Sequence, residues 1–322
     1  RRVAVQVAIA WNNSFGELLR KRYGTGIYNT LVYYNGKKTD YFVDKKELEQ
    51  FNKDLDKLLE NPEFVFGFVP EAKLFIEETY EQIKELVKDA EKLSDKDLSR
   101  LYVKFIHSCN SYYTRMWMGF RICERIVLKV ESMLRELVKD EKKVKEISRK
   151  FSTPLVPNDV TNERIDLLKI AIRKLGKDEV KQLLSEHTEK YQHIPMFDFD
   201  HEPYAYEHFV KELENIEDPE KELNKIEVSF KERKDEFEGS LHKLKPHEEL
   251  DKIIMMLKRA VFFRDYRDMV RQKLNLTIRS FYKEIGKRIG LTVEETALLT
   301  NEEIEKHLYN STGFKKKEIE DR

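Results

Sequence analysis

The stretch that decides the fold is residues 94–138, SDKDLSRLYVKFIHSCNSYYTRMWMGFRICERIVLKVESMLRELV. Ser94 is followed three residues later by Asp97, which predicts a helix start like a capping box, with Asp in place of the usual Glu. Apolar residues then recur at helical spacing. They are Leu98, Leu101, Phe105, Cys109, Tyr112, Met116, Phe120, Cys123, Val127 and Leu134. The pattern predicts one long helix over 95–138 with a continuous core-facing stripe.

A second long helix is predicted over residues 246–288, where Gly290 would end it. At 1.5 Å per residue, this helix would be roughly 60 Å long. Shorter helices are expected between the two and after them. Thr161, Asp218, Thr292 and Thr300 are expected to cap helices, and Gly176 to end one. The predicted fold is therefore mainly α, a multi-helix bundle with long helices that occupies residues 71–322.

Residues 1–70 are mixed in character and predict a small α/β module before the helical domain. IYNTLVYY at 27–34 and TDYFV at 39–43 are rich in β-branched and aromatic residues, which favours strands. Asn35-Gly36 between them is the preferred dipeptide of a tight hairpin turn. A β-hairpin is therefore expected near 27–43.

The first residues offer two interpretations. RRVAVQVAIAW has the charge, the short apolar run and the small residues of a signal peptide. The apolar run is short, however, and alternation at Val3, Val5, Val7 and Ile9 favours a strand. We therefore predict an N-terminal strand. Asp44, further on, is expected to cap a helix that begins KKELEQF.

The bulk composition excludes several classes of partner. The 322 residues carry 60 Lys and Arg against 60 Asp and Glu, so neither nucleic acid nor an anionic membrane surface is expected as a partner. No apolar run is long enough to span a bilayer. Cys109 and Cys123 fall on one predicted helix, too far apart to bridge. Two unpaired thiols suit a reducing compartment, which predicts a cytoplasmic protein.

Familiar catalytic signatures are missing from the sequence. It contains no GxGxxG, no P-loop, no HExxH, no CxxC pair and no GxSxG. The Gly24-Thr25-Gly26 stretch is too short to hold phosphate and predicts a turn before a strand. Catalytic residues therefore cannot be assigned from motifs.

The predicted helix 246–288 carries a polar block on an otherwise apolar face. Following that face gives Leu250, Ile254, Leu257, Val261, Arg264, Asp268, Arg271 and Asn275. Arg264 and Asp268 are four residues apart, and Asp268 and Arg271 are three apart, so they can pair. Three interpretations remain open: an internal ion network that braces helices, an anion pocket with two guanidinium groups, or a face that reaches water.

The predicted helix 95–138 offers a possible opposite wall for such a pocket. Trp117 and Arg121 lie off its apolar stripe, as do His107, Ser111, Thr114, Arg115, Met118 and Arg125. Aromatic and arginine side chains together can bind a flat or anionic ligand. The alternative is a solvated face with one covered tryptophan.

The stretch KYQHIPMFDFDHEPY, residues 190–204, interrupts the helices with a dense polar and aromatic loop. Its acidic residues and His201 could ligate a metal, but their spacing matches no known cage, so no metal is predicted. It is instead a substrate or interdomain loop, or a corner stiffened by proline in which Tyr191 and His193 pack.

Three stretches, taken in order, resemble a known family. They are FSTPLVPNDVTNERIDLLKIA at 151–171, SEHTEKYQHIPMFDFDHEPYAYEHF at 185–209, and FFRDYRDMVRQKLNLTIRSFYKEIGKRIGLTVEETALLTNEEIEKHL at 262–308. They resemble the helical, substrate-holding or linker part of the phosphoenolpyruvate-utilising phosphotransferases, related to phosphoenolpyruvate synthase and rifampicin phosphotransferase. Residues 15–48 are a looser match.

The resemblance implies a division of labour. In that family an ATP-grasp domain phosphorylates a histidine on a small swivelling domain, and this histidine carries the phosphate to a substrate site. Neither domain's signature occurs in this sequence. We therefore expect no cofactor in this chain, with ATP and Mg²⁺ only where those domains exist elsewhere. A swivelling phosphohistidine domain, in cis or in trans, is the implied protein partner.

The functional hypothesis is a substrate-binding part of a phosphotransferase that holds a small anionic or phosphorylatable ligand between helices. Arg264, Arg271 and Arg121 would hold the anionic group, while Tyr191 and His193 would line the pocket. The alternative is a non-catalytic helical scaffold, with Arg264, Asp268 and Arg271 as an internal brace and the 190–204 loop as a corner.

Overall fold

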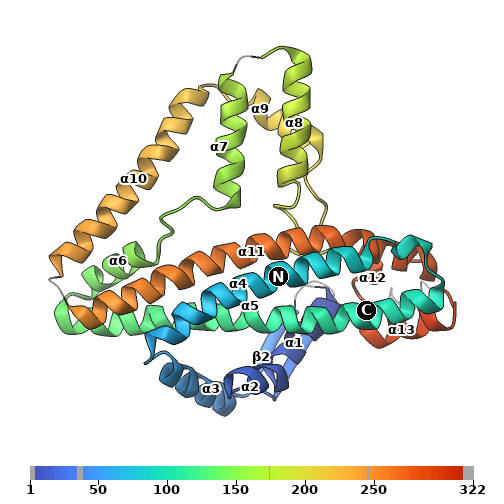
Figure 1. Ribbon diagram of the computed structural model, residues 1–322, viewed down its shortest axis with the longest axis horizontal. Coiled ribbons are helices and arrows are strands. Elements are labelled where there is room, and N and C mark those ends of the chain that lie inside the picture. Colours follow the sequence, from blue (N-terminus) through green and yellow to red (C-terminus); the bar gives the residue numbers. More distant parts are fainter. Residues whose placement is uncertain (1–3, 35–38, 174, 245–246, 315–322) are drawn as a thin grey trace. The chain divides into compact units, whose positions relative to one another are not determined.

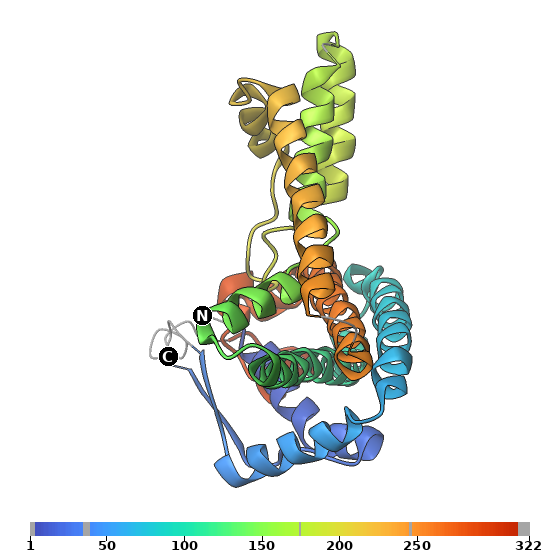
Figure 2. The ribbon, with the colours of Figure 1, turned by 90° about the vertical axis from the view of Figure 1, so that its left-hand side faces the viewer.

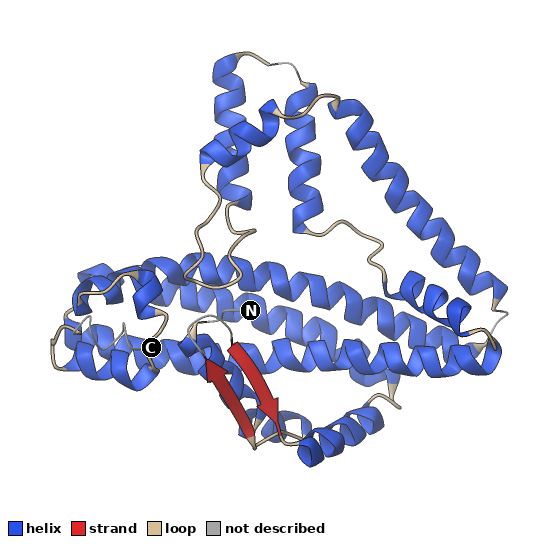
Figure 3. Ribbon diagram, turned by 180° about the vertical axis from the view of Figure 1, so that it is seen from behind, coloured by secondary structure: helices blue, strands red, loops and turns tan. Residues whose placement is uncertain are grey.

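The computed structural model describes residues 4–34, 39–173, 175–244 and 247–314. Helices dominate, and one two-stranded antiparallel hairpin lies near the N-terminus, which confirms the predicted fold class (Figures 1 and 3). The elements are α1 Val5–Phe15, α2 Glu17–Tyr23, β1 Thr30–Tyr34, β2 Thr39–Val43, α3 Lys45–Leu58, α4 Pro62–Val87, a short 3-10 helix Ala90–Lys92, α5 Asp95–Leu137, α6 Glu141–Ser152, α7 Asp159–Ile172, α8 Lys177–Tyr191, α9 Tyr206–Glu214, α10 Pro219–Lys243, α11 Glu248–Ile289, α12 Val293–Thr296 and α13 Asn301–Tyr309.

The chain divides into two compact units. Unit 1 comprises Arg1–Ile122, Met196–Glu202 and Val270–Arg322, and unit 2 comprises Cys123–Pro195 and Pro203–Met269. The division therefore falls within α5 and within α11. The predicted module boundary at residue 70 lies inside α4, which continues through Pro70.

The N-terminal segment of unit 1 is a helix, so the predicted strand is wrong. Residues 5–15 form α1, and Val5 N donates to the carbonyl of Ala297 at 2.8 Å. Buried Gln6 donates through Nε2 to the carbonyls of Thr296 and Leu299, at 2.7 and 2.6 Å. The apolar residues satisfy a period of 3.6 as well as a period of two, and the alanines between them favour helix.

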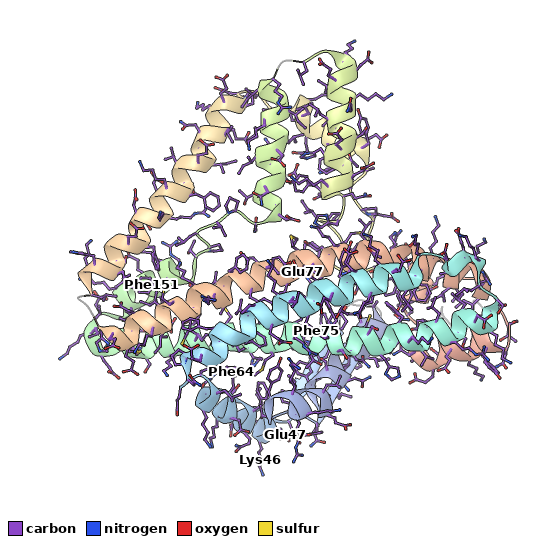
Figure 4. All side chains as sticks on the ribbon, in the orientation of Figure 1. Lys46, Glu47, Phe64, Phe75, Glu77 and Phe151 are labelled. Carbon is purple, nitrogen blue, oxygen red and sulfur yellow. The ribbon has the colours of Figure 1, made fainter. Side chains whose placement is uncertain are left out.

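The hairpin is antiparallel, as predicted, with Thr30 opposite Val43 and Val32 opposite Tyr41 (Figure 3). The predicted Asn35-Gly36 turn lies outside the described residues. Asp44 caps α3 by accepting a hydrogen bond from Glu47 N at 2.9 Å, as expected. The Glu47 carboxylate, labelled in Figure 4, in turn accepts the backbone N–H of Tyr28 at 2.7 Å and ties α3 to the strand entry.

The core of unit 1 lies between α4, the first part of α5 and the last part of α11 (Figures 1 and 2). Phe105 of α5 meets Phe281 of α11 edge to face, with ring centroids 5.2 Å apart. On α4, Phe75 (Figure 4) lies beneath the Arg115 guanidinium, 3.4 Å from its carbon to the ring centroid. Aromatic contacts of this kind add to the area that the three helices bury.

Helix α5 begins as predicted, because Asp97 N donates to Ser94 Oγ at 3.2 Å. Most of its predicted stripe is buried, but Phe120 is 38% exposed, while Met118, placed off the stripe, is fully buried. The helix is covered on more than one side, so a single stripe describes it incompletely. Both cysteines are free and buried, and burial raises the pKa of each thiol.

Unit 2 is built from α6 to α10 with the adjoining parts of α5 and α11. The α7, α8 and α9 helices share an apolar core: Leu167, Ile170, Leu184, Tyr191, Ile194 and Phe209. Phe151 of α6 (Figure 4) meets Phe237 of α10, with centroids 5.5 Å apart. Two cap predictions shift here. Asn158, not Thr161, caps α7, and Gly176 opens α8 instead of closing the preceding helix.

The remaining local signals agree with the sequence. Asp218 caps α10, and Thr292 and Thr300 form capping boxes at α12 and α13. Helix α11 stops before Gly290, whose φ of 81° suits glycine. Within the described ranges, no helix combines the length and the apolar composition needed to cross a bilayer.

Candidate functional site

The predicted polar block of α11 is divided between the two units. Arg264 and Asp268 belong to unit 2, where each pairs along its own helix. Arg264 Nε lies 3.1 Å from Asp265 Oδ1, and Arg267 Nη2 lies 3.9 Å from Asp268 Oδ1. These side chains are 26–47% exposed, apart from Arg267 at 10%, so solvent screens most of their charge.

Arg271 and Asn275 belong to unit 1, beside the segment 196–202 of the same unit. Asn275 is buried and donates through Nδ2 to the Met196 carbonyl at 3.0 Å. The positive charge of Arg271 acts on buried Asp198 and opposes the rise in the pKa of that carboxyl. Asn275 therefore contacts the segment that the sequence analysis also singled out, and the charge of Arg271 acts on it.

The 196–202 segment is anchored to unit 1 by its own backbone and side chains. Asp198 is buried and accepts hydrogen bonds from Ala4 N at 2.7 Å and Phe199 N at 2.8 Å. Burial, together with the neighbouring charge of Asp200, raises the pKa of Asp198 to about 7. Arg279 donates to the Phe199 carbonyl at 3.0 Å. The segment, which lies in the sequence between two stretches of unit 2, thus packs into unit 1.

Metal binding finds no support in this segment. Among the described residues, no group of three or more His, Cys, Asp or Glu side chains is placed to hold a metal ion. His201 Nδ1 lies 3.2 Å from Asp200 Oδ1, which is a pair and not a cage.

Trp117 and Arg121 contact other parts of unit 1. Trp117 packs against Trp11 and Phe15 of α1, with ring centroids 5.4 and 4.7 Å apart. Arg121 donates through Nη2 to Asn52 Oδ1 of α3 at 2.6 Å. Both side chains join α5 to the N-terminal helices.

Tyr191 and His193 of unit 2 both bond to carboxylates of α7. The Tyr191 hydroxyl donates to Asp166 Oδ2 at 2.7 Å, and burial is the main cause that raises the pKa of this phenol to about 12. Buried His193 holds Asp159 Oδ2 through Nε2 at 2.7 Å. These contacts fix the end of α8 on α7.

Unit 2 also contains an apolar cavity of about 410 Å³, which the sequence analysis did not predict. Its walls are the 153–158 loop, the start of α7, one side chain of α10 and one face of α11. The lining residues are Thr153, Pro154, Leu155, Val156, Pro157, Asn158, Asp159, Asn162, Phe237, Met255, Lys258, Val261, Phe262, Asp265, Tyr266 and Met269. This volume suits a small organic molecule.

Lys258 is the cation in the wall of this cavity. It is half-buried, its Nζ donates to the Thr153 carbonyl at 3.1 Å, and the same atom lies 4.1 Å from the ring centroid of Phe237. Burial lowers the pKa of Lys258 to about 8. An amine with a lowered pKa in an apolar cavity is a recognised sign of a functional site.

None of the predicted site residues lines this cavity, but His193 contacts a residue that does. Asp159, the partner of His193, lines the cavity. The sequence held a signal for Lys258: it and Arg259 are the charged residues in the apolar run IIMMLKRAVFF, residues 253–263. A lysine inside such a run lies on or beside a buried face.

A scan against protein-family models finds no match to this chain, and a search of curated proteins finds no matching sequence.

Proposed function

We propose that this chain is the ligand-binding helical part of a phosphotransferase of the phosphoenolpyruvate-utilising type, and that its ligand occupies the unit 2 cavity. One observation carries the proposal. The loop FSTPLVPND, on which the family resemblance partly rests, forms a wall of the cavity that also contains Lys258. One of the stretches that suggest the family thus lines this apolar cavity.

The lining defines the chemistry of the ligand. Leu155, Val156 and Phe262 offer an apolar wall, and the Lys258 ammonium offers one charge and hydrogen-bond donors. A ligand with an apolar body and one carboxylate, phosphate or phosphate-accepting hydroxyl meets both. Pairing that oxygen with a half-buried ammonium is stronger than the same contact in water.

The phosphate in this scheme comes from elsewhere. A phosphohistidine on a swivelling domain, in cis or in trans, would deliver it to the bound ligand, and ATP and Mg²⁺ would act on that other domain. The test is whether the gene for this chain, or one beside it, encodes a glycine-rich, histidine-bearing domain. A gene neighbourhood without one would remove the phosphotransfer part of the proposal.

A scaffold role is the second candidate, and the ion pairs along α11 favour it. Arg264 and Asp268 each have an acidic or basic neighbour on their own helix. As a scaffold, the chain would bind no small molecule in the cavity.

The binding experiment uses hydrocinnamate, a small apolar carboxylate, observed by ligand-detected NMR. We expect saturable binding that Lys258→Met weakens at least about tenfold, because the variant loses the charged partner of the carboxylate. Lys252→Met is the matched control, since Lys252 lies on the same helix but is exposed and paired with Glu248.

A second variant tests the location. Val156 lines the cavity and is 54% exposed, so Val156→Trp can narrow the cavity with little cost to the fold. We expect it to weaken binding as well. Hydrocinnamate that binds all four proteins equally, or none, would contradict the proposed ligand site and leave the scaffold role.

A further inference from the structure

We infer that the Lys258 amine forms an imine with small apolar aldehydes or ketones that enter the unit 2 cavity, an inference that rests on the proposed ligand site. It extends that site from holding an oxygen-bearing ligand to reversible covalent capture of a carbonyl compound. The reactive atom is Lys258 Nζ, and the substrate class is a carbonyl group on an apolar body.

The surroundings of Lys258 differ from those of Lys190 and Lys252. Lys190 and Lys252 each pair with a carboxylate, at 2.7 and 2.6 Å. Among the described residues, Lys258 has no carboxylate within ion-pair distance; its Nζ has the Thr153 carbonyl and the Phe237 ring. A neutral carbonyl and an aromatic face offset the loss of water around the ammonium only in part.

The consequence is a larger neutral fraction of the amine. With the pKa at about 8, roughly one Lys258 amine in ten is neutral at pH 7, against about one in three thousand for a lysine at the ordinary 10.5. The lone pair of the neutral amine is the nucleophile in imine formation. Lys258 is therefore primed relative to surface lysines by burial in an apolar wall.

The reaction needs no external oxidant or reductant. The Nζ lone pair attacks the carbonyl carbon, a C–N bond forms, and the C=O π pair moves to oxygen, which takes a proton. The nitrogen then loses one proton, its lone pair forms C=N as the protonated hydroxyl leaves as water, and the iminium ion releases its remaining N–H proton. One amine and one carbonyl thus give one imine and one water, and hydrolysis reverses the step.

Acidic groups for the proton transfers line the same cavity. Asp159 comes from the start of α7, and Asp265 and Tyr266 come from α11. The side chain that α10 contributes is Phe237, which carries no proton to exchange. Asp159 is already held by His193 at 2.7 Å, so it is fixed in position. Asp159, Asp265 and Tyr266 are the titratable groups that share the cavity lining with the amine.

The experiment traps the imine on the intact chain with hydrocinnamaldehyde and cyanoborohydride, followed by peptide mass spectrometry. Hydride addition to the imine carbon fixes the adduct as a secondary amine, with a mass gain equal to the aldehyde less one oxygen. We expect Lys258 to be labelled at least about tenfold faster than Lys252 at pH 7, as its larger neutral fraction requires. The rate should rise with a midpoint near pH 8.

Controls separate this inference from the ligand site itself. Lys258→Arg should lose the fast label, and Val156→Trp should slow it. Fast labelling without hydrocinnamate binding would support the imine and contradict the proposed anion site. Hydrocinnamate binding with Lys258 labelled no faster than Lys252 would overturn the imine and leave the ligand site. Failure of both would overturn both.

Discussion

The rings of Phe199 and Tyr282 stack face to face, with centroids 3.7 Å apart and planes at 5°. Phe199 belongs to the 196–202 segment of unit 1, and Tyr282 to the last part of α11. Both are almost fully buried in unit 1. The stretch that looks in sequence like a polar functional loop therefore contributes a large aromatic to the core of unit 1.

Phe199→Ala tests that contribution. Truncating a buried phenylalanine removes apolar burial and leaves a cavity, so we expect unit 1 to lose about 3–5 kcal/mol of unfolding free energy. Both tryptophans of the chain, Trp11 and Trp117, lie in unit 1, so tryptophan fluorescence during urea unfolding reports this unit. Phe197→Ala is the control, because Phe197 is 44% exposed and should cost less than about 1 kcal/mol. Equal losses in the two variants would contradict the burial argument.

The unfolding free energy of unit 1 should depend on pH because Asp198 titrates. Its pKa is raised to about 7 by burial and by Asp200, so the folded state favours the protonated form. The stability that a raised carboxyl pKa gives to the folded state is complete below about pH 4 and is lost as the pH rises through 7. We expect the unfolding free energy to fall across this window by an amount of the order of a few kcal/mol, measured by urea unfolding at several pH values.

Two variants isolate the group responsible. Asp198→Asn cannot ionise and should flatten the dependence. Asp200→Asn removes the like charge and should move the midpoint to lower pH. A wild-type slope that survives in Asp198→Asn would assign the titration to another group.

Local signals in the sequence identified the elements well, because a helix cap depends on residues within one turn. Ser94, Asp218, Thr292 and Thr300 all begin helices where expected. The prediction of an N-terminal strand was wrong because the structure of this segment depends on distant residues. Its alternation fits two periods, and the choice is made by distant contacts of Gln6 with α12 and the residues after it.

Local sequence patterns could not predict the candidate cavity. Lys258 meets Thr153, 105 positions away in the sequence, and Phe237 on another helix, and its pKa depends on that burial. An anion pocket with both guanidinium groups was one of three interpretations of the polar block on α11, but the residues of one helix face can belong to two compact units. Arg264 and Arg271 consequently belong to different units.

The α7–α8 pair depends on a buried histidine that is bonded to a carboxylate. His187 is 5% exposed, and its Nε2 lies 3.0 Å from Glu163 Oε1. Glu163→Ala leaves a buried ring nitrogen without its acceptor, which costs about 1–3 kcal/mol. We expect faster hydrogen exchange across α7 and α8, followed by mass spectrometry. Glu163→Gln retains a hydrogen-bond acceptor and should lose less stability. Glu186 is exposed, so Glu186→Ala should change the exchange rates little. A change as large in Glu186→Ala would refute this.

Two glycines of unit 1 should respond oppositely to alanine. A Cβ on Gly26 would lie 2.5 Å from the Gly16 carbonyl oxygen and 3.1 Å from that of Phe15, both backbone atoms that cannot turn aside. Gly26→Ala should therefore destabilise unit 1 by about 1–3 kcal/mol, the usual cost of forced overpacking. Gly67 lies inside α4 with no atom within 4 Å of such a Cβ. Gly67→Ala should stabilise by about 0.5–1 kcal/mol, because alanine restricts the unfolded chain and favours helix. Tryptophan-detected urea unfolding measures both, and a neutral Gly26→Ala would mean that the turn between α2 and β1 relaxes freely.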